Sequence, residues 1–271
     1  KALKKPSEFI KKWKERGFHN LEEHIQGTRI RHVKKTFDQR TRQIVLPVKS
    51  FKDALTLQKK IFRKYRESAS ITQHIATRPK GIIEIKSQDT YMAAAGDLIQ
   101  VTSIQPETPI EILSVEFGKG YAWHGYENRL YRGNIAIALS ANKSLDVVNI
   151  IHIETLLRGI LPSEIYPDAH PEALKAQAVA ARSHILASLG NKHILQPFDI
   201  CSTQHCQVYG GSGREQNKTN RAIKQTRGMI LAKATKLVDA VYSSTCGGFY
   251  LPYLWQAPKE NFFKCTFSPC E

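Results

Sequence analysis

The stretch LPSEIYPDAHPEALKAQAVAARSHILASL, residues 161–189, joins a glutamate in apolar surroundings to an alanine-rich segment with the features of a helix. Pro171 suits the first position of that helix, and Gly190 suits its end. The small residues along it let other backbone approach closely, which is typical of a helix inside a core. We expect this stretch to line the bottom of an active site, whose sides are formed by the rest of the chain.

Glu164 follows Ile-Leu-Pro and precedes Ile165, with a serine beside it. Apolar surroundings disfavour the charged form of a carboxyl group, so we expect this side chain to hold a proton near neutrality. A general acid for cleavage of a glycosidic bond needs that property. The alternative is a surface or helix-capping glutamate.

Two cations on the same helix need an explanation. Lys175 and Arg182 lie seven residues apart, and therefore on one face of the helix with Val179 between them. On an otherwise apolar helix they need either solvent or anionic partners, which makes them candidates for a catalytic cleft. A surface position for both is the alternative.

Charge divides the chain into two regions. The net charge is +16, and residues 1–80 hold 22 Lys and Arg against 7 Asp and Glu. We therefore expect a basic module over 1–90 and a second domain over 91–271. A basic module could bind nucleic acid, anionic lipid or an acidic wall polymer, or could be merely a solvated basic surface. No window approaches eighteen consecutive apolar residues, so we expect a soluble protein without a transmembrane segment.

Hydrophobic periodicity predicts mixed helices and strands, and hence an α+β fold. Expected helices cover residues 1–25, 52–65, 171–189 and 219–226. Expected strands cover residues 29–33, 43–48, 70–76, 81–85, 97–103, 110–117, 129–140, 145–151, 229–231 and 238–242. Residues 141–144 (Ala-Asn-Lys-Ser) suit a hairpin turn between two of these strands.

All five cysteines, at 201, 206, 246, 265 and 270, lie in the second half of the chain. Cys201, His205 and Cys206, with His193 upstream, are ligands of the kind that hold a structural zinc ion. A Cys201–Cys206 disulfide is the alternative, favoured in an oxidising compartment. Cys246, in the segment SSTCGG, is a candidate nucleophile, although no local signature supports a cysteine hydrolase.

Four blocks stand in the order in which SpoIID/LytB proteins carry them. They are PSE at 162–164, PEALKAQAVAAR at 171–182, FDICSTQHCQVYGG at 198–211 and YSSTCGG at 242–248. Over roughly residues 128–258 the chain thus resembles the SpoIID/LytB family, which implies a SpoIID-like mixed sheet domain around the alanine-rich helix. Members of the SpoIID branch are bacterial lytic transglycosylases that cut peptidoglycan glycan strands, whereas the LytB branch is described as enhancing a partner amidase.

The resemblance implies roles for individual residues. Glu164 matches the catalytic glutamate, Lys175 and Arg182 match the helix cations, and the loop with Cys201, His205 and Cys206 matches one that holds zinc in some members. His193 lies further from Cys201 than the upstream histidine of the zinc-binding members. Substrate contacts are expected from Gln207, Tyr209, Ser243, Ser244 and Thr245.

We therefore expect a secreted or periplasmic enzyme at the bacterial cell wall, which cleaves the MurNAc–GlcNAc β-1,4 bond with Glu164 as general acid and base. Peptide-stripped and N-deacetylated glycan are candidate forms of its substrate. No cofactor is expected to be required for catalysis, and zinc would be structural. Lysozyme-type hydrolysis would need a second carboxylate, for which Asp168, Glu172 and Asp199 are candidates. A non-catalytic wall-binding enhancer of a cell-wall amidase is the second hypothesis. Nucleic-acid binding through residues 1–80 ranks last, and no nucleic-acid partner is expected.

Overall fold

The computed structural model describes residues 6–73, 79–105, 107–140, 142 and 144–242. Helices and small antiparallel sheets alternate along the chain, so the fold is α+β, as the sequence predicts. The helices are α1 (Pro6–Glu15), α2 (Phe51–Tyr65), α3 (Ile153–Glu164), α4 (Pro171–Ser188), α5 (Asn217–Gln225) and the short 3₁₀ helix η1 (Ser212–Arg214). Among the described residues, no helix is long and apolar enough to cross a bilayer.

The strands pair only antiparallel within the described ranges. They are β1 (Glu22–Gln26), β2 (Arg29–His32), β3 (Lys35–Asp38), β4 (Thr41–Val45), β5 (Ile83–Ser87), β6 (Thr90–Ala95), β7 (Leu98–Val101), β8 (Ile110–Phe117), β9 (Gly125–Tyr131), β10 (Asn134–Leu139), β11 (Leu145–Ile150), β12 (Ala232–Lys233) and β13 (Lys236–Leu237). A three-stranded sheet has the order β11-β10-β7, and the other strands form two-stranded ribbons. The predicted hairpin is present, with Leu139 of β10 opposite Leu145 of β11.

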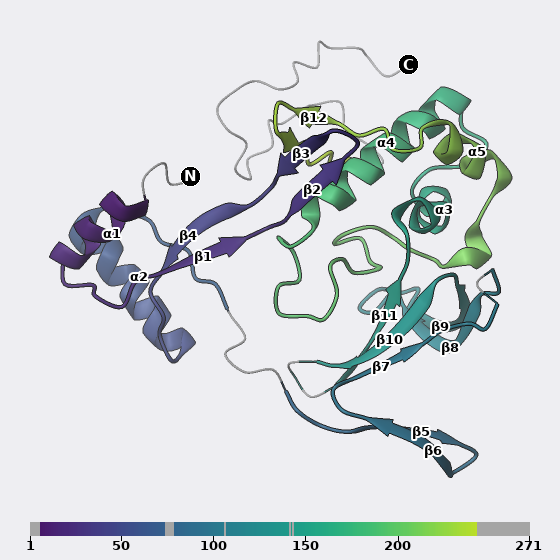
Figure 1. Cartoon of the computed structure of the whole chain (residues 1–271), viewed down its shortest axis with the longest axis horizontal. Coiled ribbons are helices and arrows are strands. Elements are labelled where there is room, and N and C mark those ends of the chain that lie inside the picture. The colour runs from purple at the N-terminus through teal and green to yellow at the C-terminus, as the bar shows by residue number, and fades with distance from the viewer. Residues whose placement is uncertain (1–5, 74–78, 106, 141, 143, 243–271) are drawn as a thin grey trace.

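Helices α3, α4 and α5 lie together on one side of the β7–β10–β11 sheet (Figure 1). The central helix α4 begins at Pro171, and Leu174, Ala178, Ala181 and Ile185 are buried at helical spacing along it. Leu157, Ile160 and Leu161 of α3 are fully buried in the same core. The predicted helix over 171–189 is therefore confirmed as the helix around which the core forms.

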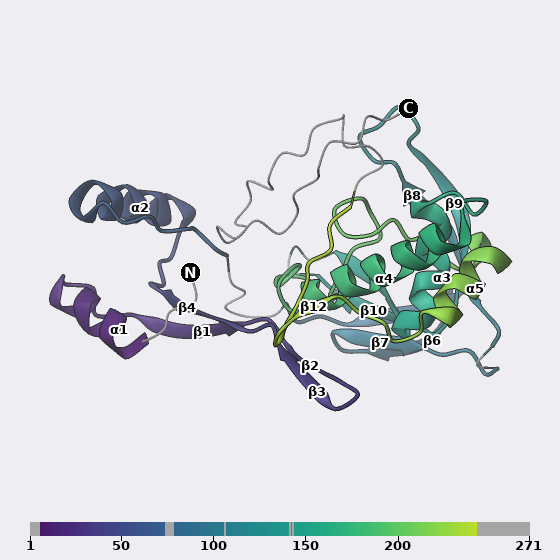
Figure 2. The ribbon, with the colours of Figure 1, turned by 90° about the horizontal axis from the view of Figure 1, so that it is seen from above.

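The N-terminal helices stand apart from this core. In Figure 2 α1 and α2 lie at the end of the β1–β4 ribbon, away from α3 to α5. They are joined by an aromatic cluster in which Trp13, 6% exposed, contacts Phe18 and Tyr65 with ring centroids 5.3 and 5.4 Å apart. Burial of aromatic rings supplies most of the packing that so small a unit can form.

The β2–β3 ribbon, in contrast, packs on the C-terminal part of the chain. Phe37 is buried against Ala187 of α4 and Leu237 of β13. The Gly27 N–H donates to the carbonyl of Gly190, and the Gln39 side-chain oxygen accepts from the Leu237 N–H. A module that ends near residue 90 stays a prediction, and these contacts link it to the end of α4.

The structure corrects several expected elements. The first helix ends at Glu15, before Gly17 with its positive φ of 89°, and residues 22–26 form β1. The expected strand 129–140 is two strands, separated by Gly133, where a Cβ would lie 2.5 Å from the Ile150 carbonyl oxygen. Helix α3 was not predicted, because Pro162 lies inside it. Residues 229–231 and 238–242 form no strand, and part of the expected strand 70–76 lies outside the described residues.

Candidate functional site

Glu164 is the last residue of α3, and its side chain is half-buried. Its Oε1 accepts a hydrogen bond of 2.8 Å from the backbone N–H of Val208. No other hydrogen bond or ion pair reaches this carboxyl group from the described parts of the chain. One oxygen is therefore held in place, and the other has no polar partner among the described residues.

Close packing between α3 and the segment around Tyr209 brings Val208 to Glu164. Gly159 makes it possible, because a Cβ there would lie 2.5 Å from the Tyr209 ring and 2.6 Å from the Gly211 carbonyl oxygen. A larger residue at this position would push the segment away from the helix. The geometry around Glu164 thus depends on a glycine one turn earlier in the same helix.

Gln207 and Tyr242 lie next to this position. The Tyr242 hydroxyl donates to Gln207 Oε1 at 2.5 Å, and Gln207 is 2% exposed. Burial raises the pKa of the Tyr242 phenol, and the charge of Glu164 adds to this effect. Tyr242 therefore keeps its proton at neutral pH. No role is expected for Tyr242 from the sequence alone, although it is the first residue of the block YSSTCGG.

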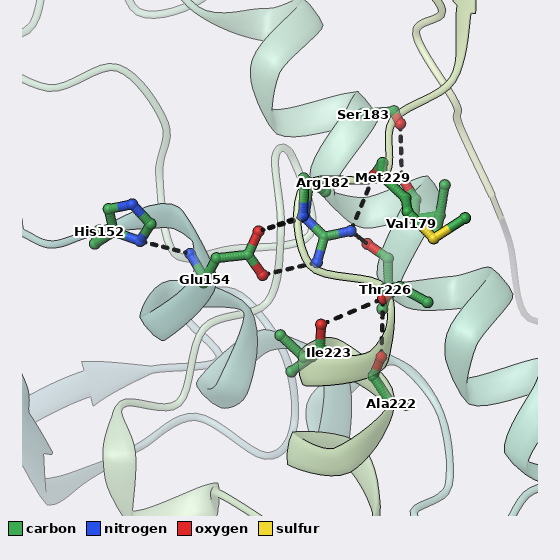
Figure 3. A network of polar contacts seen from close by, with 11 residues as sticks. His152, Glu154, Val179, Arg182, Ser183, Ala222, Ile223, Thr226 and Met229 are labelled. Carbon is green, nitrogen blue, oxygen red and sulfur yellow. Dashed lines mark hydrogen bonds and ion pairs between the residues drawn. The ribbon is translucent and has the colours of Figure 1, made fainter. Parts of the chain in front are cut away.

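Arg182 has a different role from the one expected. Its side chain is 1% exposed, and its Nε and Nη2 donate to the two carboxylate oxygens of Glu154 at 2.9 and 2.8 Å (Figure 3). Nη1 donates to the Met229 carbonyl oxygen at 3.0 Å, and the Gly228 N–H donates to Glu154 Oε1 at 3.1 Å. The interpretation of Arg182 as a cleft cation is corrected, because its guanidinium group is buried and is held by Glu154 and by backbone carbonyl oxygens.

Lys175 has an anionic partner nearer to the surface. Its Nζ lies 2.7 Å from Oε1 of Glu172, whose side chain is 70% exposed. The hydrogen bond from Lys175 holds the pKa of Glu172 below its ordinary value. Neither Lys175 nor Arg182 forms an ion pair with Glu164. Of the two expected alternatives, solvent or anionic partners, both cations have anionic partners.

The expected substrate-contact residues fall into two groups. Tyr209 is 8% exposed, and its hydroxyl donates to Asn149 Oδ1 at 2.9 Å. Burial raises the pKa of this phenol, and Tyr209 belongs to the main core. Tyr209 therefore packs in the core, and its expected contact with substrate, like that of the buried Gln207, stays a prediction. Ser243, Ser244 and Thr245 lie outside the described residues, as do Cys246, Cys265 and Cys270.

His193, Cys201, His205 and Cys206 come together in one cluster. All of their ligand atoms lie within 4.8 Å of one another, and His193 Nε2 is 3.2 Å from Cys206 Sγ. His205 Nδ1 lies 3.4 Å from Cys206 Sγ and 3.7 Å from Cys201 Sγ. Tetrahedral zinc needs ligand atoms roughly 3.3–3.8 Å apart. The donor set and its spacing therefore fit zinc, although His193 is distant in sequence.

Both Cys201 and Cys206 are free cysteines in this structure. Burial raises the pKa of the Cys206 thiol. At Cys201 burial acts in the same direction, but the hydrogen bonds with Thr203 and Cys206 outweigh it and lower the pKa. Burial also lowers the pKa of His193, which favours the neutral imidazole that binds metals.

Among known proteins, the SpoIID family model, described as a stage II sporulation protein, matches residues 141–232. This span contains Glu164, the helix α4 and all four residues of the cysteine–histidine cluster. Residues 141–232 belong to the SpoIID family. The family assignment agrees with the coarse functional expectation of a protein related to the bacterial cell wall.

Three curated relatives resemble this SpoIID region. An uncharacterized protein of Brachyspira hyodysenteriae is 35% identical over 129 residues, which are 48% of this chain and 34% of the relative. The amidase enhancer of Bacillus subtilis is 39% identical over 93 residues, 34% of this chain and 12% of the relative. Stage II sporulation protein D of Bacillus amyloliquefaciens is 31% identical over 139 residues, 46% of this chain and 40% of the relative.

The chain therefore spans well under half the length of these relatives. No solved structure matches it.

Proposed function

We propose that the SpoIID region cleaves peptidoglycan glycan strands at the MurNAc–GlcNAc β-1,4 bond, outside the cell membrane, with Glu164 as general acid and base. The observation that carries the proposal is the carboxyl group of Glu164, which is held through one oxygen by the Val208 N–H and has no partner at the other oxygen within residues 6–242 as described. A general acid needs such a fixed carboxyl group with one oxygen directed at the leaving group. Its position inside the matched family region adds support.

The reaction needs two proton transfers, both through the carboxyl group of Glu164. Glu164 donates its proton to the glycosidic oxygen while the bond from that oxygen to C1 of MurNAc breaks through an oxocarbenium-like state. The resulting carboxylate then accepts the proton of the MurNAc 6-hydroxyl, and O6 forms a bond to C1. The products are a 1,6-anhydro end and a free 4-hydroxyl, and the protonation of Glu164 is restored.

Hydrolysis by water would need a second carboxylate to activate it. Asp168 is 88% exposed and pairs with Lys218 at 2.7 Å, and Glu172 pairs with Lys175. Asp199 is exposed on the segment before Cys201. Both ion pairs lower the pKa of the carboxyl group, so Asp168 and Glu172 are weakened as bases, which favours the intramolecular route over lysozyme-type hydrolysis.

The test is digestion of purified glycan by the parent and by Glu164→Gln, with products identified by mass spectrometry. Positioned acid catalysis contributes typically about 10²–10⁴-fold, so the variant should be folded and lose activity by a factor in that range. Glu172→Gln, an exposed carboxylate change on the next helix, is the matched control and should stay active. Equal digestion by Glu164→Gln and the parent would reject the assignment. Reducing ends in place of anhydro ends would favour hydrolysis.

A second function, enhancement of a cell-wall amidase, is favoured by the relative named amidase enhancer. It predicts no soluble fragments from the protein alone, and faster peptide release when an amidase is added. In that case Glu164→Gln would enhance the amidase as well as the parent does.

The cluster of His193, Cys201, His205 and Cys206 would hold a zinc ion in a closed set of four ligands, typical of structural zinc. When bound, zinc would bridge the segment that carries His193 to the loop 201–206. Val208 follows two residues after this loop, so the cluster lies close in sequence to the N–H that holds Glu164.

The N-terminal region would bind an acidic wall polymer through one face of α2. Lys52, Lys59, Lys60, Arg63 and Lys64 are exposed on this helix, and none of them forms an ion pair in the described parts of the chain. Like charges three and four residues apart on a helix repel one another and destabilise it. An anionic partner would reduce this repulsion.

Substitution tests this role better than deletion, because removing residues 1–80 would also remove Phe37 and expose the surface of α4 against which it packs. Replacing Lys59, Lys60, Arg63 and Lys64 with glutamine should weaken co-sedimentation with sacculi. The control replaces four cations outside α2 (Lys34, Lys35, Lys224 and Arg227), which changes net charge equally. If both sets weaken sedimentation alike, the effect comes from net charge and the proposed face is wrong.

A further inference from the structure

The turn between β8 and β9 carries a stack of aromatic rings outside the core. Trp123 lies parallel to Phe117 on one strand end and to Tyr121 in the turn, with ring centroids 6.4 and 5.0 Å apart and interplanar angles of 18°. Tyr121 and Trp123 are 55% and 54% exposed. Large aromatic rings that stack but remain half in water are not accounted for by packing of the core.

Two glycines fix the orientation of these rings. A Cβ at Gly118 would lie 2.3 Å from a carbon of the Trp123 ring, and one at Gly125 would lie 2.8 Å from the Phe117 ring. The rings therefore rest directly on the backbone. Within the turn the Tyr121 N–H donates to the Gly118 carbonyl oxygen at 2.9 Å. A platform held in this way loses little conformational entropy when a ligand covers it.

The stack is joined to the candidate site. The Tyr121 hydroxyl donates to Oε1 of Gln204 at 3.2 Å. Gln204 lies in the loop between Cys201 and Cys206, and Val208, shortly after this loop, donates to Glu164. One continuous segment therefore links the platform to the carboxyl group proposed as the acid.

We propose that Tyr121 and Trp123 bind a pyranose ring of the glycan strand at a position away from the bond that is cleaved. The flat face of a β-linked pyranose presents C–H groups, which suit the electron-rich face of an aromatic ring. Glu116, next to Phe117, pairs with His124 at 3.0 Å, so polar groups capable of hydrogen bonding to sugar hydroxyls border the rings. This inference rests on the proposed glycan substrate, and neither residue lies in the segment that the family model matches.

The experiment measures binding without cleavage, in a Glu164→Gln background. The probes are the soluble β-1,4-linked tetramer of N-acetylglucosamine and peptide-free glycan strands. Trp123→Ala and Tyr121→Ala should each weaken binding by about two- to tenfold, the range of a single aromatic contact. Trp123→Phe should retain most of the affinity. Tyr91→Ala, which removes an equally exposed aromatic ring from β6, is the matched control and should bind normally.

Tryptophan fluorescence supplies a second measurement, since the chain has three tryptophans and Trp13 is buried. Either probe should shift the emission, and the shift should be lost in Trp123→Phe. Binding that is unchanged in both alanine variants, or weakened equally in Tyr91→Ala, would overturn the platform, as would a parent that binds neither probe. If Glu164→Gln still cleaves glycan but Trp123→Ala binds weakly, the catalytic assignment fails and the platform stands.

Discussion

Glu154 near the start of α3 and Arg182 in α4 form a two-point ion pair, with N–O distances of 2.9 and 2.8 Å and an arginine side chain that is 1% exposed. The same glutamate accepts the Gly228 N–H, so one carboxylate joins three segments. Glu164 lies at the other end of α3, on a helix whose position this pair helps to fix. Arg182 therefore supports the candidate site from inside the protein and not from the cleft.

Removing one partner of this pair should be costly. Arg182→Met leaves Glu154, whose side chain is only 14% exposed, without its cation, and we expect the free energy of unfolding to fall by about 3–5 kcal/mol. Urea denaturation measures this loss. Lys175→Met, which breaks the exposed pair with Glu172, is the control and should cost about 0–1 kcal/mol. Because a surface arginine would be replaced at little cost, equal stabilities of the two variants would contradict the buried role of Arg182.

The N–H of Val208 should matter for activity while its side chain should not. Val208→Pro removes the donor to Glu164 Oε1, and we expect a fall in glycan cleavage of about 10–100-fold through misplacement of the carboxyl group. Val208→Ala keeps the N–H and should cleave glycan nearly as fast as the parent. Thermal melting of both variants separates loss of fold from loss of geometry. Equal activity of folded Val208→Pro and Val208→Ala would show that the hydrogen bond is dispensable.

Local patterns predicted some of these features, and contacts between distant residues decided the others. Helix α4 was predictable because three local features all indicate a buried helix: the proline at its start, its many small residues and the helical spacing of its apolar residues. Helix α3 was not predicted because a proline such as Pro162 usually ends a helix. Its N-cap is also unusual, since a ring nitrogen of His152 accepts the hydrogen bond from the Glu154 N–H. The ligand spacing of Cys201, His205 and Cys206 is local and was visible in the sequence.

The function of Arg182 was not visible, because its partner is 28 residues away and periodicity does not identify partners across helices. The same holds for Tyr121 and Gln204, which lie 83 residues apart. The segment that carries the candidate site was predictable from the sequence. The contacts within the site could be identified only from the folded structure.

Zinc should bind to the cluster with one ion per chain. Removing metal with a chelator and adding zinc back should raise the melting temperature, corresponding to about 4 kcal/mol when free zinc exceeds its Kd a thousandfold. Cys206→Ser should lose this response, and His19→Gln, a change at a described histidine outside the cluster, should keep it. Metal content is measured by elemental analysis. Thiols at 201 and 206 that react with alkylating agents only after reduction would favour the disulfide instead.

Acid should loosen the contact between α1 and α2. Glu67 accepts from Lys12 Nζ at 2.8 Å and from Arg16 Nη1 at 2.9 Å, and these hydrogen bonds, that from Lys12 first, hold its pKa below the ordinary value of 4.5. A carboxyl group with a lowered pKa in the folded state stabilises it fully above the ordinary value and loses this contribution as the pH falls through the lowered one. At pH 7 we expect Glu67→Gln to cost a few tenths to about 1 kcal/mol, since the pair is partly exposed. The difference in melting temperature between parent and variant should shrink as the pH falls below 4.5. Glu111→Gln, which removes an exposed carboxylate from β8, is the control and should leave the melting temperature nearly unchanged at pH 7. A difference for Glu67→Gln that stays constant to pH values well below 4.5 would mean that the charge of Glu67 does not join the two helices.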